Sequence, residues 1–252
     1  MIAPVRRRAA YRLACALLGA ALLSSNADAV ELPRPFSVSL SGRVFLVGEV
    51  HVQLSLERFD KHVRYRMRTR GNIMTIRTEL YDCSVVAVRD GRLYPLEYKH
   101  TDKRKPTRNT LTSFDWDKQT ATVSYENDQR SVVVEKLIWP VWDPMSVQVK
   151  AMIDLASGEW APDKEKEYTL LERGRLGVWR LRRVEDAPIE AGRSVRTVRL
   201  ERIDDKPYKL WFAPDFQYLP VQMSVRDAIA VIESDPANAG AEVSVSKEIP
   251  HC

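Results

Sequence analysis

Apolar and polar residues alternate with a period of two along most of this chain, the pattern of strands that have one buried and one solvent-facing side. The alternation is clearest over residues 36–46, 50–57 and 63–70. A two-residue hairpin loop at 59–60 would place Leu56 opposite Val63, so that the apolar residues of both strands share one face. The pattern therefore predicts an antiparallel sheet with one buried face.

The same alternation predicts strands along nearly the whole chain. Further candidates are residues 73–81, 84–89, 92–100, 114–126, 167–172, 176–184, 194–203, 208–213 and 217–225. The pair Asp90-Gly91 favours a tight hairpin turn, and a second turn is expected at Lys118-Gln119. A flat sheet of ten or more strands would be unusually wide. We therefore predict a mainly β fold with one large, strongly curved antiparallel sheet, in the form of a spiral, half-barrel or barrel.

One segment, WDPMSVQVKAMIDLASG at residues 142–158, departs from the period of two. Its apolar residues recur at intervals of three and four, the spacing of one face of a helix. Asp143 suits the N-cap, Pro144 the first helical position and Gly158 the far end. We predict a helix at about 143–157 that plugs the open side of the curved sheet. Helix initiation explains Asp143 without a catalytic role.

Residues 1–29 have the three parts of a secretory signal peptide: four early arginines, an apolar stretch at 13–23 and a small-x-small cleavage site at 27–29. The stretch is far shorter than the roughly 20 residues that span a bilayer, and no later segment reaches that length. We predict export to the periplasm and a single mature domain, residues 30–252, without a stable membrane span. Twin-arginine export and lipidation at Cys15 remain as alternatives.

The signal peptide also accounts for most of the positive charge. The chain has 39 Lys and Arg against 34 Asp and Glu; four of the former and one of the latter lie in residues 1–29. The remainder is close to neutral, with a net charge of +2. Nucleic acid, which a strongly basic chain would suggest, is therefore not a predicted partner.

Three cysteines occur, and removal of residues 1–29 leaves Cys83 and Cys252. In an oxidising compartment these two form the only possible internal pair, which we predict as a disulfide. Two free thiols, or a Cys252 that pairs with a partner, are the alternatives.

Few residues suggest catalysis. The four histidines, His51, His62, His100 and His251, do not have metal-ligand spacing, and we expect them at the surface. Asp115 and Asp117 point to one side of a strand, a separation that overlaps that of glycosidase carboxylates, but a solvated hairpin face is the simpler interpretation. No nucleophile elbow or phosphate-binding glycine loop occurs. We predict no enzymatic activity, no cofactor and no metal.

Two sets of residues are candidates for binding. The first would line an apolar ligand site between helix and sheet: Met145, Val149, Met152, Ile153, Trp139, Trp142 and Trp211. The second would contact an anionic partner: Lys103, Arg104, Lys105 and Arg108. Arginines also follow one face of residues 64–70, where nearby glutamates make a solvated face the simpler interpretation.

Four segments, DGRLYPLEYKH (90–100), FDWDKQTA (114–121), DPMSVQVKAMIDL (143–155) and WFAPDFQYLPVQM (211–223), resemble in order and spacing the domain-of-unknown-function family 3108 of exported Gram-negative proteins. The resemblance covers about residues 35–226 and leaves 227–252 as a C-terminal extension. It implies a periplasmic protein whose curved sheet is similar to that of envelope lipid and lipoprotein carriers. It implies no activity.

These observations lead to two main hypotheses. The first is a monomeric, non-enzymatic periplasmic protein that binds a lipid or a lipidated partner in the concave face of the sheet. The second is a structural or protein-interaction factor of the cell envelope that has no ligand. A hydrolase that uses Asp115 and Asp117 is a third and weaker hypothesis.

Overall fold

The computed structural model describes residues 32–44, 48–73, 76–191, 193–204, 208–225, 228–239 and 250–252, and the predicted signal peptide lies outside them. The strands are β1 (Phe36–Val44), β2 (Gly48–Arg58), β3 (His62–Ile73), β4 (Ile76–Arg89), β5 (Arg92–Asp102), β6 (Thr110–Asp115), β7 (Thr120–Tyr125), β8 (Ser131–Val134), β9 (Glu165–Glu172), β10 (Arg175–Glu190), β11 (Ser194–Arg202), β12 (Tyr208–Ala213), β13 (Leu219–Val225) and β14 (Ala228–Ile232). The helices are α1 (Ser146–Ala156) and the short 3-10 turns η1 (Pro106–Arg108), η2 (Pro214–Phe216) and η3 (Pro236–Asn238).

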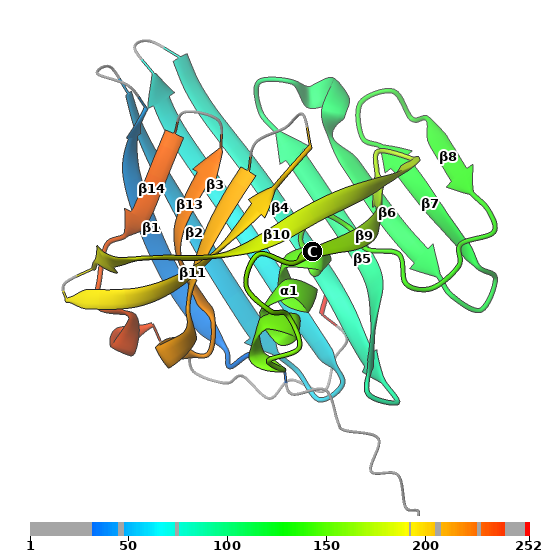
Figure 1. Ribbon diagram of the computed structural model, residues 1–252. Helices are drawn as coiled ribbons and strands as arrows, with labels where there is room; N and C mark the ends of the chain where they lie inside the picture. The colour runs from blue at the N-terminus through cyan, green and yellow to red at the C-terminus, as the bar shows by residue number, and fades with distance from the viewer. Residues whose placement is uncertain are drawn as a thin grey trace, which may run out of the picture.

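All 14 described strands belong to one antiparallel sheet, in the order β8-β7-β6-β5-β4-β3-β2-β1-β14-β13-β12-β11-β10-β9. The sheet curves so strongly that its second half crosses in front of the first (Figure 1). Each described strand pairs with its neighbours in sequence, except that β8 and β9 do not pair and form the two ends of the sheet. The pairing of β1 with β14 joins the two halves. The predicted fold class is confirmed.

The two ends of the sheet approach each other without pairing as strands in the described part of the chain. The hydroxyl of Tyr125, at the end of β7, donates a hydrogen bond to the carbonyl of Arg173 in the β9–β10 turn, at 2.9 Å. The outer edge of β9 is instead occupied by Trp142, whose amide donates to Thr169 and whose carbonyl accepts from Leu171. The sheet is therefore curled but not closed.

The predicted register of the first hairpin is wrong by two residues. Leu56 lies opposite Tyr65 rather than Val63, because β2 ends at Arg58 and the Phe59 amide bonds to the carbonyl of His62. A shift of two residues leaves every side chain on its predicted face, so the division into buried and exposed faces is still correct. The turn at Asp90-Gly91 is confirmed, with positive φ at both residues.

The helix starts later than predicted, at Ser146 rather than near Asp143. Asp143 still satisfies the first free amides, because its Oδ1 accepts hydrogen bonds from Met145 N at 2.8 Å and Ser146 N at 2.9 Å. The hydroxyl of Ser146 in turn accepts from Asp143 N. Asp143 therefore caps a turn that leads into α1, rather than the first residue of the helix itself.

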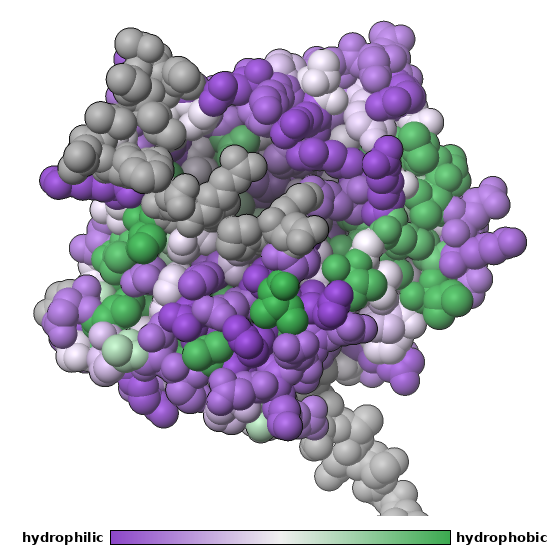
Figure 2. Space-filling view, turned by 45° about the horizontal axis from the view of Figure 1, so that its top comes forward, coloured by the Kyte–Doolittle hydropathy of each residue, from purple (hydrophilic) through white to green (hydrophobic). Residues whose placement is uncertain are grey.

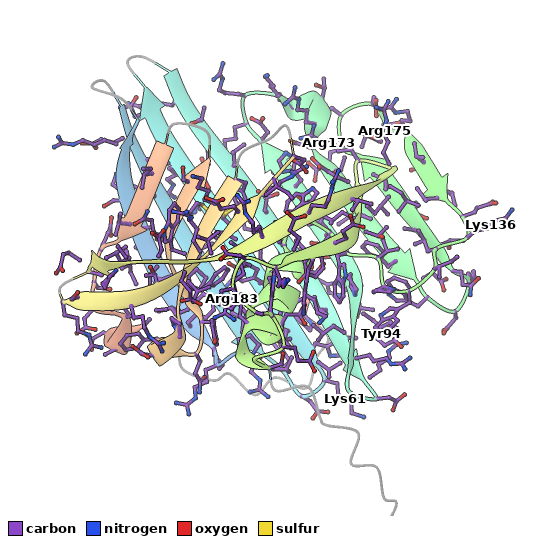
Figure 3. The ribbon with its side chains drawn as sticks, in the orientation of Figure 1. Lys61, Tyr94, Lys136, Arg173, Arg175 and Arg183 are labelled. Carbon is purple, nitrogen blue, oxygen red and sulfur yellow. A yellow bond between two sulfur atoms is a disulfide. The ribbon has the colours of Figure 1, made fainter. Side chains whose placement is uncertain are left out.

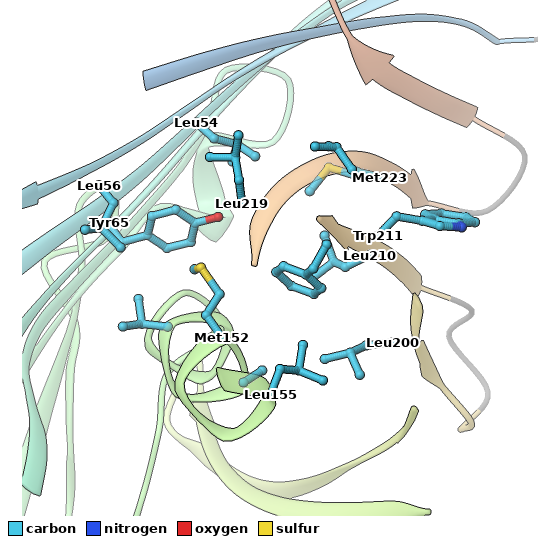
Figure 4. Packing of buried hydrophobic residues seen from close by; sticks show 14 of the residues in the cluster. Leu54, Leu56, Tyr65, Met152, Leu155, Leu200, Leu210, Trp211, Leu219 and Met223 are labelled. Atoms are coloured by element: carbon cyan, nitrogen blue, oxygen red, sulfur yellow. The ribbon is translucent and has the colours of Figure 1, made fainter. Parts of the chain in front are cut away.

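The hydrophobic core lies between the two halves of the sheet and is filled by α1. Nine of the eleven residues of the helix are buried, including Met152 and Leu155. Figure 4 shows these two side chains between Tyr65 on one half and Leu200 on the other. The helix is thus buried nearly all round because it has sheet on both sides.

The predicted disulfide between Cys83 and Cys252 is present, with a Cα–Cα distance of 5.7 Å. The end of the chain is held further by Glu97, which accepts a hydrogen bond from the Cys252 amide at 2.7 Å, and by Arg64, which donates to the carbonyl of His251. Neighbouring strand residues point to opposite faces. The terminus is therefore anchored on the face of β4 opposite to that of Asp82.

Candidate functional site

A cleft opens where the two ends of the sheet approach each other. It consists of an outer pocket of about 450 Å³ and an inner pocket of about 210 Å³, which share four lining residues. The shared residues are Glu172, Arg173, Trp179 and Arg202. Arg173 and Arg175 mark its position at the β9–β10 turn, beside the β6–β8 end of the sheet (Figure 3). The combined size is in the range of small-molecule sites.

The inner pocket contains a hydrogen-bonded group built on β4 and β5. Asp82 lies opposite His100 in the register, and Ser84 lies opposite Tyr98, so these four side chains share one face. Asp82 Oδ1 accepts from the Tyr98 hydroxyl and is bonded to His100 Nδ1, both at 2.8 Å. Asp82, Tyr98 and His100 all line the pocket.

Three buried polar atoms around this group have no hydrogen-bond partner among the described residues: His100 Nε2, Thr110 Oγ1 and Tyr208 Oη. Thr110, 1% exposed, lies directly across from His100 in the β5–β6 register and also lines the inner pocket. Buried polar atoms normally have partners, so atoms of this kind beside a pocket indicate a place for a ligand or ordered water.

The tyrosine hydroxyls at the inner end remain protonated over the whole physiological range. Burial, followed by the negative charge of Asp82, raises the pKa of Tyr98 well above its usual value. Burial, followed by Tyr65 and Asp82, does the same to the pKa of Tyr208. Tyr98 therefore keeps the hydrogen that it donates to Asp82, and Tyr208 keeps a hydrogen that no described residue accepts.

The floor of the inner pocket comes from the turn that precedes α1. Pro144 lines the pocket, and Asp143 beneath it is fully buried. Ser84 donates a hydrogen bond to Asp143 Oδ2 at 2.7 Å. Burial raises the pKa of Asp143 to about 6, although the hydrogen bonds from Ser146, Ser84 and Met145 act in the opposite direction.

The outer pocket is larger and more open, and exposed apolar side chains form part of its wall. Leu176 and Val178 line it and are 50% and 51% exposed. Apolar surface continues onto the neighbouring end of the sheet, where Figure 2 shows a hydrophobic patch over β7 and β8 at the right of the view; Val133 on β8 is 57% exposed. An apolar wall of this kind is unusual in a solvated surface and typical of a binding site.

Charges of both signs lie between the two pockets. The Arg202 guanidinium stacks 4.3 Å from the centre of the Trp179 ring and bonds to Asp204 at 2.5 Å. Within the described part of the chain, the side chains of Glu172 and Arg173 make no hydrogen bond or ion pair. The cleft therefore offers one cation and one anion whose charges are not compensated by direct contact.

The seven residues predicted to line an apolar ligand site do not line this cleft. Six of them, Met145, Val149, Met152, Ile153, Trp142 and Trp211, are buried in the packed core. Trp139 is 36% exposed and lies elsewhere, against Tyr94, with its indole nitrogen bonded to Leu93 O at 3.0 Å. The helix face thus contacts protein along its length.

The predicted anionic-partner residues, Lys103, Arg104, Lys105 and Arg108, are all exposed. Lys103 forms an ion pair with Glu79 at 2.5 Å, and Glu79 also forms an ion pair with Arg68. The arginine face is likewise paired, because Arg64 and Arg66 both contact Glu57. Only part of the basic run is therefore available to a partner.

Asp115 and Asp117 lie at a solvent-exposed hairpin turn. Hydrogen bonds from the Lys118 side chain and backbone lower the pKa of Asp115. Neither residue lines the outer or the inner pocket. This arrangement does not form the cleft that a pair of glycosidase carboxylates requires.

The sequence prediction that His100 lies at the surface is wrong, since its side chain is only 14% exposed. A usable signal was present: Tyr98 and His100 alternate on one face of a strand, and Asp82 lies in the apolar segment 81–88. Trp179 and Arg202 gave no such signal. They come from a distant part of the sequence and reach the cleft only because the sheet curls.

Neither a metal site nor a membrane-spanning helix is found in the part of the chain that the structure describes. No group of three or more His, Cys, Asp or Glu is placed there to hold a metal ion. No described helix is long and apolar enough to cross a bilayer.

Comparison with known proteins places the chain in a family without an assigned function. Among curated proteins none matches significantly. A solved structure, described as a β-barrel-like protein of domain of unknown function DUF1849 from Brucella abortus, is similar with a TM-score of 0.49 and 8% identity, over 81% of this chain and 96% of that one. The family described as "Protein of unknown function (DUF3108)" matches residues 35–234, slightly beyond the expected span. The chain therefore belongs to the DUF3108 family.

Proposed function

We propose that this protein is exported to the cell envelope and binds an amphiphilic ligand, a lipid or the lipid group of a partner, without catalysing a reaction on it. The observation that carries the proposal is the cleft, in which an exposed apolar wall leads to a buried polar end. The proposal moves the ligand from the helix face to the cleft, because the core around α1 is filled by protein.

The geometry suits an amphiphile whose apolar chain lies in the outer pocket and whose polar head lies in the inner pocket. Leu176 and Val178 offer solvent-exposed apolar surface whose burial against an alkyl chain is favourable, by about 25 cal/mol per Å². The polar end offers atoms that need hydrogen-bond partners. A purely apolar ligand would leave those atoms unsatisfied, and a purely polar one would leave the wall in water.

The test begins with the processed protein isolated from the periplasm of a Gram-negative host. Solvent extraction and mass spectrometry should show co-purified lipid at a defined ratio. The double variant Leu176→Ser, Val178→Ser should lose most of it, whereas the control Ile229→Ser, which changes an equally exposed residue on β14, should not. Absence of lipid from the wild-type protein, together with no binding of added lipid, would refute the proposal.

A second candidate function is an interaction with an acidic envelope component, supported by the exposed side chains of Arg104, Lys105 and Arg108. Replacement of Lys103, Arg104 and Lys105 by Ala should abolish capture of such a partner from envelope extracts. The replacement of Arg43, an exposed arginine outside the cleft, serves as the control. Unchanged capture by the triple variant would exclude the basic run.

A further inference from the structure

We infer that the inner pocket is a headgroup subsite for a phosphate ester that carries a hydrogen-bond donor, either a hydroxyl or an ammonium, at its far end. This inference rests on the proposed lipid-binding function and adds the class of head that the cleft selects. It follows from which polar atoms of the pocket are hydrogen-bond donors and which are acceptors.

The first step is the state of His100. A carboxylate only accepts hydrogen bonds, so the contact of Asp82 Oδ1 with Nδ1 requires the proton on Nδ1. In the neutral ring, Nε2 then carries a lone pair. It is buried, beside the pocket, and without a partner among the described residues. The pocket therefore presents an acceptor that an N–H or O–H of a ligand can satisfy.

The second step is the hydroxyl of Thr110. Thr110 is almost completely buried across from His100, and its Oγ1 has no partner in the described structure. A hydroxyl can donate to a phosphate oxygen or accept from an ammonium. A head with both a donor and an oxygen acceptor matches this set.

The third step is charge. Arg173 and Arg202 line both pockets and provide positive charge for a phosphate. Glu172 and Asp82 line the inner pocket and balance that charge. The site is therefore suited to a head with separated negative and positive or donor groups, such as phosphoethanolamine or phosphoglycerol. A phosphocholine head is the informative comparison, because its quaternary nitrogen has no hydrogen to donate.

The experiment compares three single-chain phospholipids with the same 14-carbon acyl group and with ethanolamine, glycerol or choline heads. Binding to the disulfide-bonded mature protein is measured by native mass spectrometry in competition, below the micelle concentration. The ethanolamine or glycerol lipid should bind about tenfold more tightly than the choline lipid, the difference expected when one buried acceptor is left unsatisfied. Which of the two donor-bearing heads binds better distinguishes an ammonium from a hydroxyl.

The variant His100→Phe removes the acceptor. It should bind all three lipids about equally, while its affinity for the choline lipid should stay close to that of the wild type. The exposed His51 provides the matched control, and His51→Phe should keep the wild-type preference. If His100→Phe fails to fold, Thr110→Val, which keeps the shape and removes the hydroxyl, should weaken binding of the donor-bearing lipids. Nitrogen NMR of the His100 ring should also show the Nε2 signal shifted by the bound ethanolamine lipid.

The outcomes separate the two proposals. Equal binding of all three lipids, or a preference that persists in the folded His100→Phe variant, would overturn the headgroup subsite and leave lipid binding intact. No binding of any lipid would overturn both, and the inner pocket would then hold only ordered water.

Discussion

Asp143 should make this protein less stable as the pH rises from 4 to 7. Its pKa is about 6 in the folded protein against an ordinary value of 3.8, mainly because of burial. A raised pKa of a carboxyl group means that its contribution to stability is fully present below the unfolded value and is lost as the pH rises through the folded value. A shift of about 2 units corresponds to about 3 kcal/mol at pH 7.

The variant Asp143→Asn should remove this pH dependence. Its side-chain oxygen can still accept from the amides of Met145 and Ser146, while no charge has to be buried. Ser84 would have to turn its hydroxyl to accept from the new amide, which offsets part of the gain. We therefore expect the variant to be more stable than wild type by about 1–3 kcal/mol at pH 7, and less so or not at all at pH 4.

The assay is urea unfolding with the disulfide intact, at half-unit steps from pH 4 to 8. The quantity compared is the difference in the free energy of unfolding between variant and wild type, because other titrating groups then cancel. Asp117→Asn, at an exposed turn, is the control and should give a constant difference. A constant difference for Asp143→Asn as well, or one of opposite slope, would refute the reasoning. Asp143→Ala should instead destabilise, because the amides at the start of α1 lose their acceptor.

Three other predictions concern stability. Removal of the disulfide by Cys83→Ala, Cys252→Ala should lower the free energy of unfolding by up to about 5 kcal/mol in the chain-entropy model, given its sequence separation of 169, and an unchanged denaturation midpoint would contradict this. Gly42→Ala should cost about 3 kcal/mol or prevent folding, because the added carbon would lie 1.7 Å from a backbone oxygen of β14. The matched Gly177→Ala, with open space around it, should leave thermal unfolding nearly unchanged. Met152→Ala should cost about 2–5 kcal/mol by opening a cavity in the core, and a loss below about 1 kcal/mol would mean that the helix is not tightly packed.

Residues 82–87 of β4 are buried on both faces, so alternation does not identify a buried side there. The sequence was sufficient for β2, because alternation with a period of two records its buried side directly. It did not determine register, since a shift of two residues leaves both faces unchanged, as at Leu56 and Tyr65. Two short strands were not predicted. β8 is only four residues long and mostly valine, and β14 is only five, so neither shows clear alternation.

The cleft was harder to predict than the sheet for a physical reason. Its histidine and aspartate come from adjacent strands, and their shared face was implicit in the alternation of β4 and β5. Trp179 and Arg202, by contrast, lie about 80 and about 100 residues beyond His100 in the chain. Their position depends on how far the sheet curls, a property of twist and packing accumulated over many strands. No local sequence pattern specifies how far the sheet curls.

The cleft exists because the sheet stops short of closure. The atoms of β9 that would pair with β8 in a closed barrel are partly used by Trp142, which bonds to Thr169 and Leu171. The segment that leads from β8 to α1 therefore competes with β8 for this edge. At the other end of the gap, Tyr125 bonds to Arg173 and holds the two halves together. The segment that leads into α1 thus has two effects. It places the helix in the core, and it keeps the two edges of the sheet apart, which leaves the pocket open.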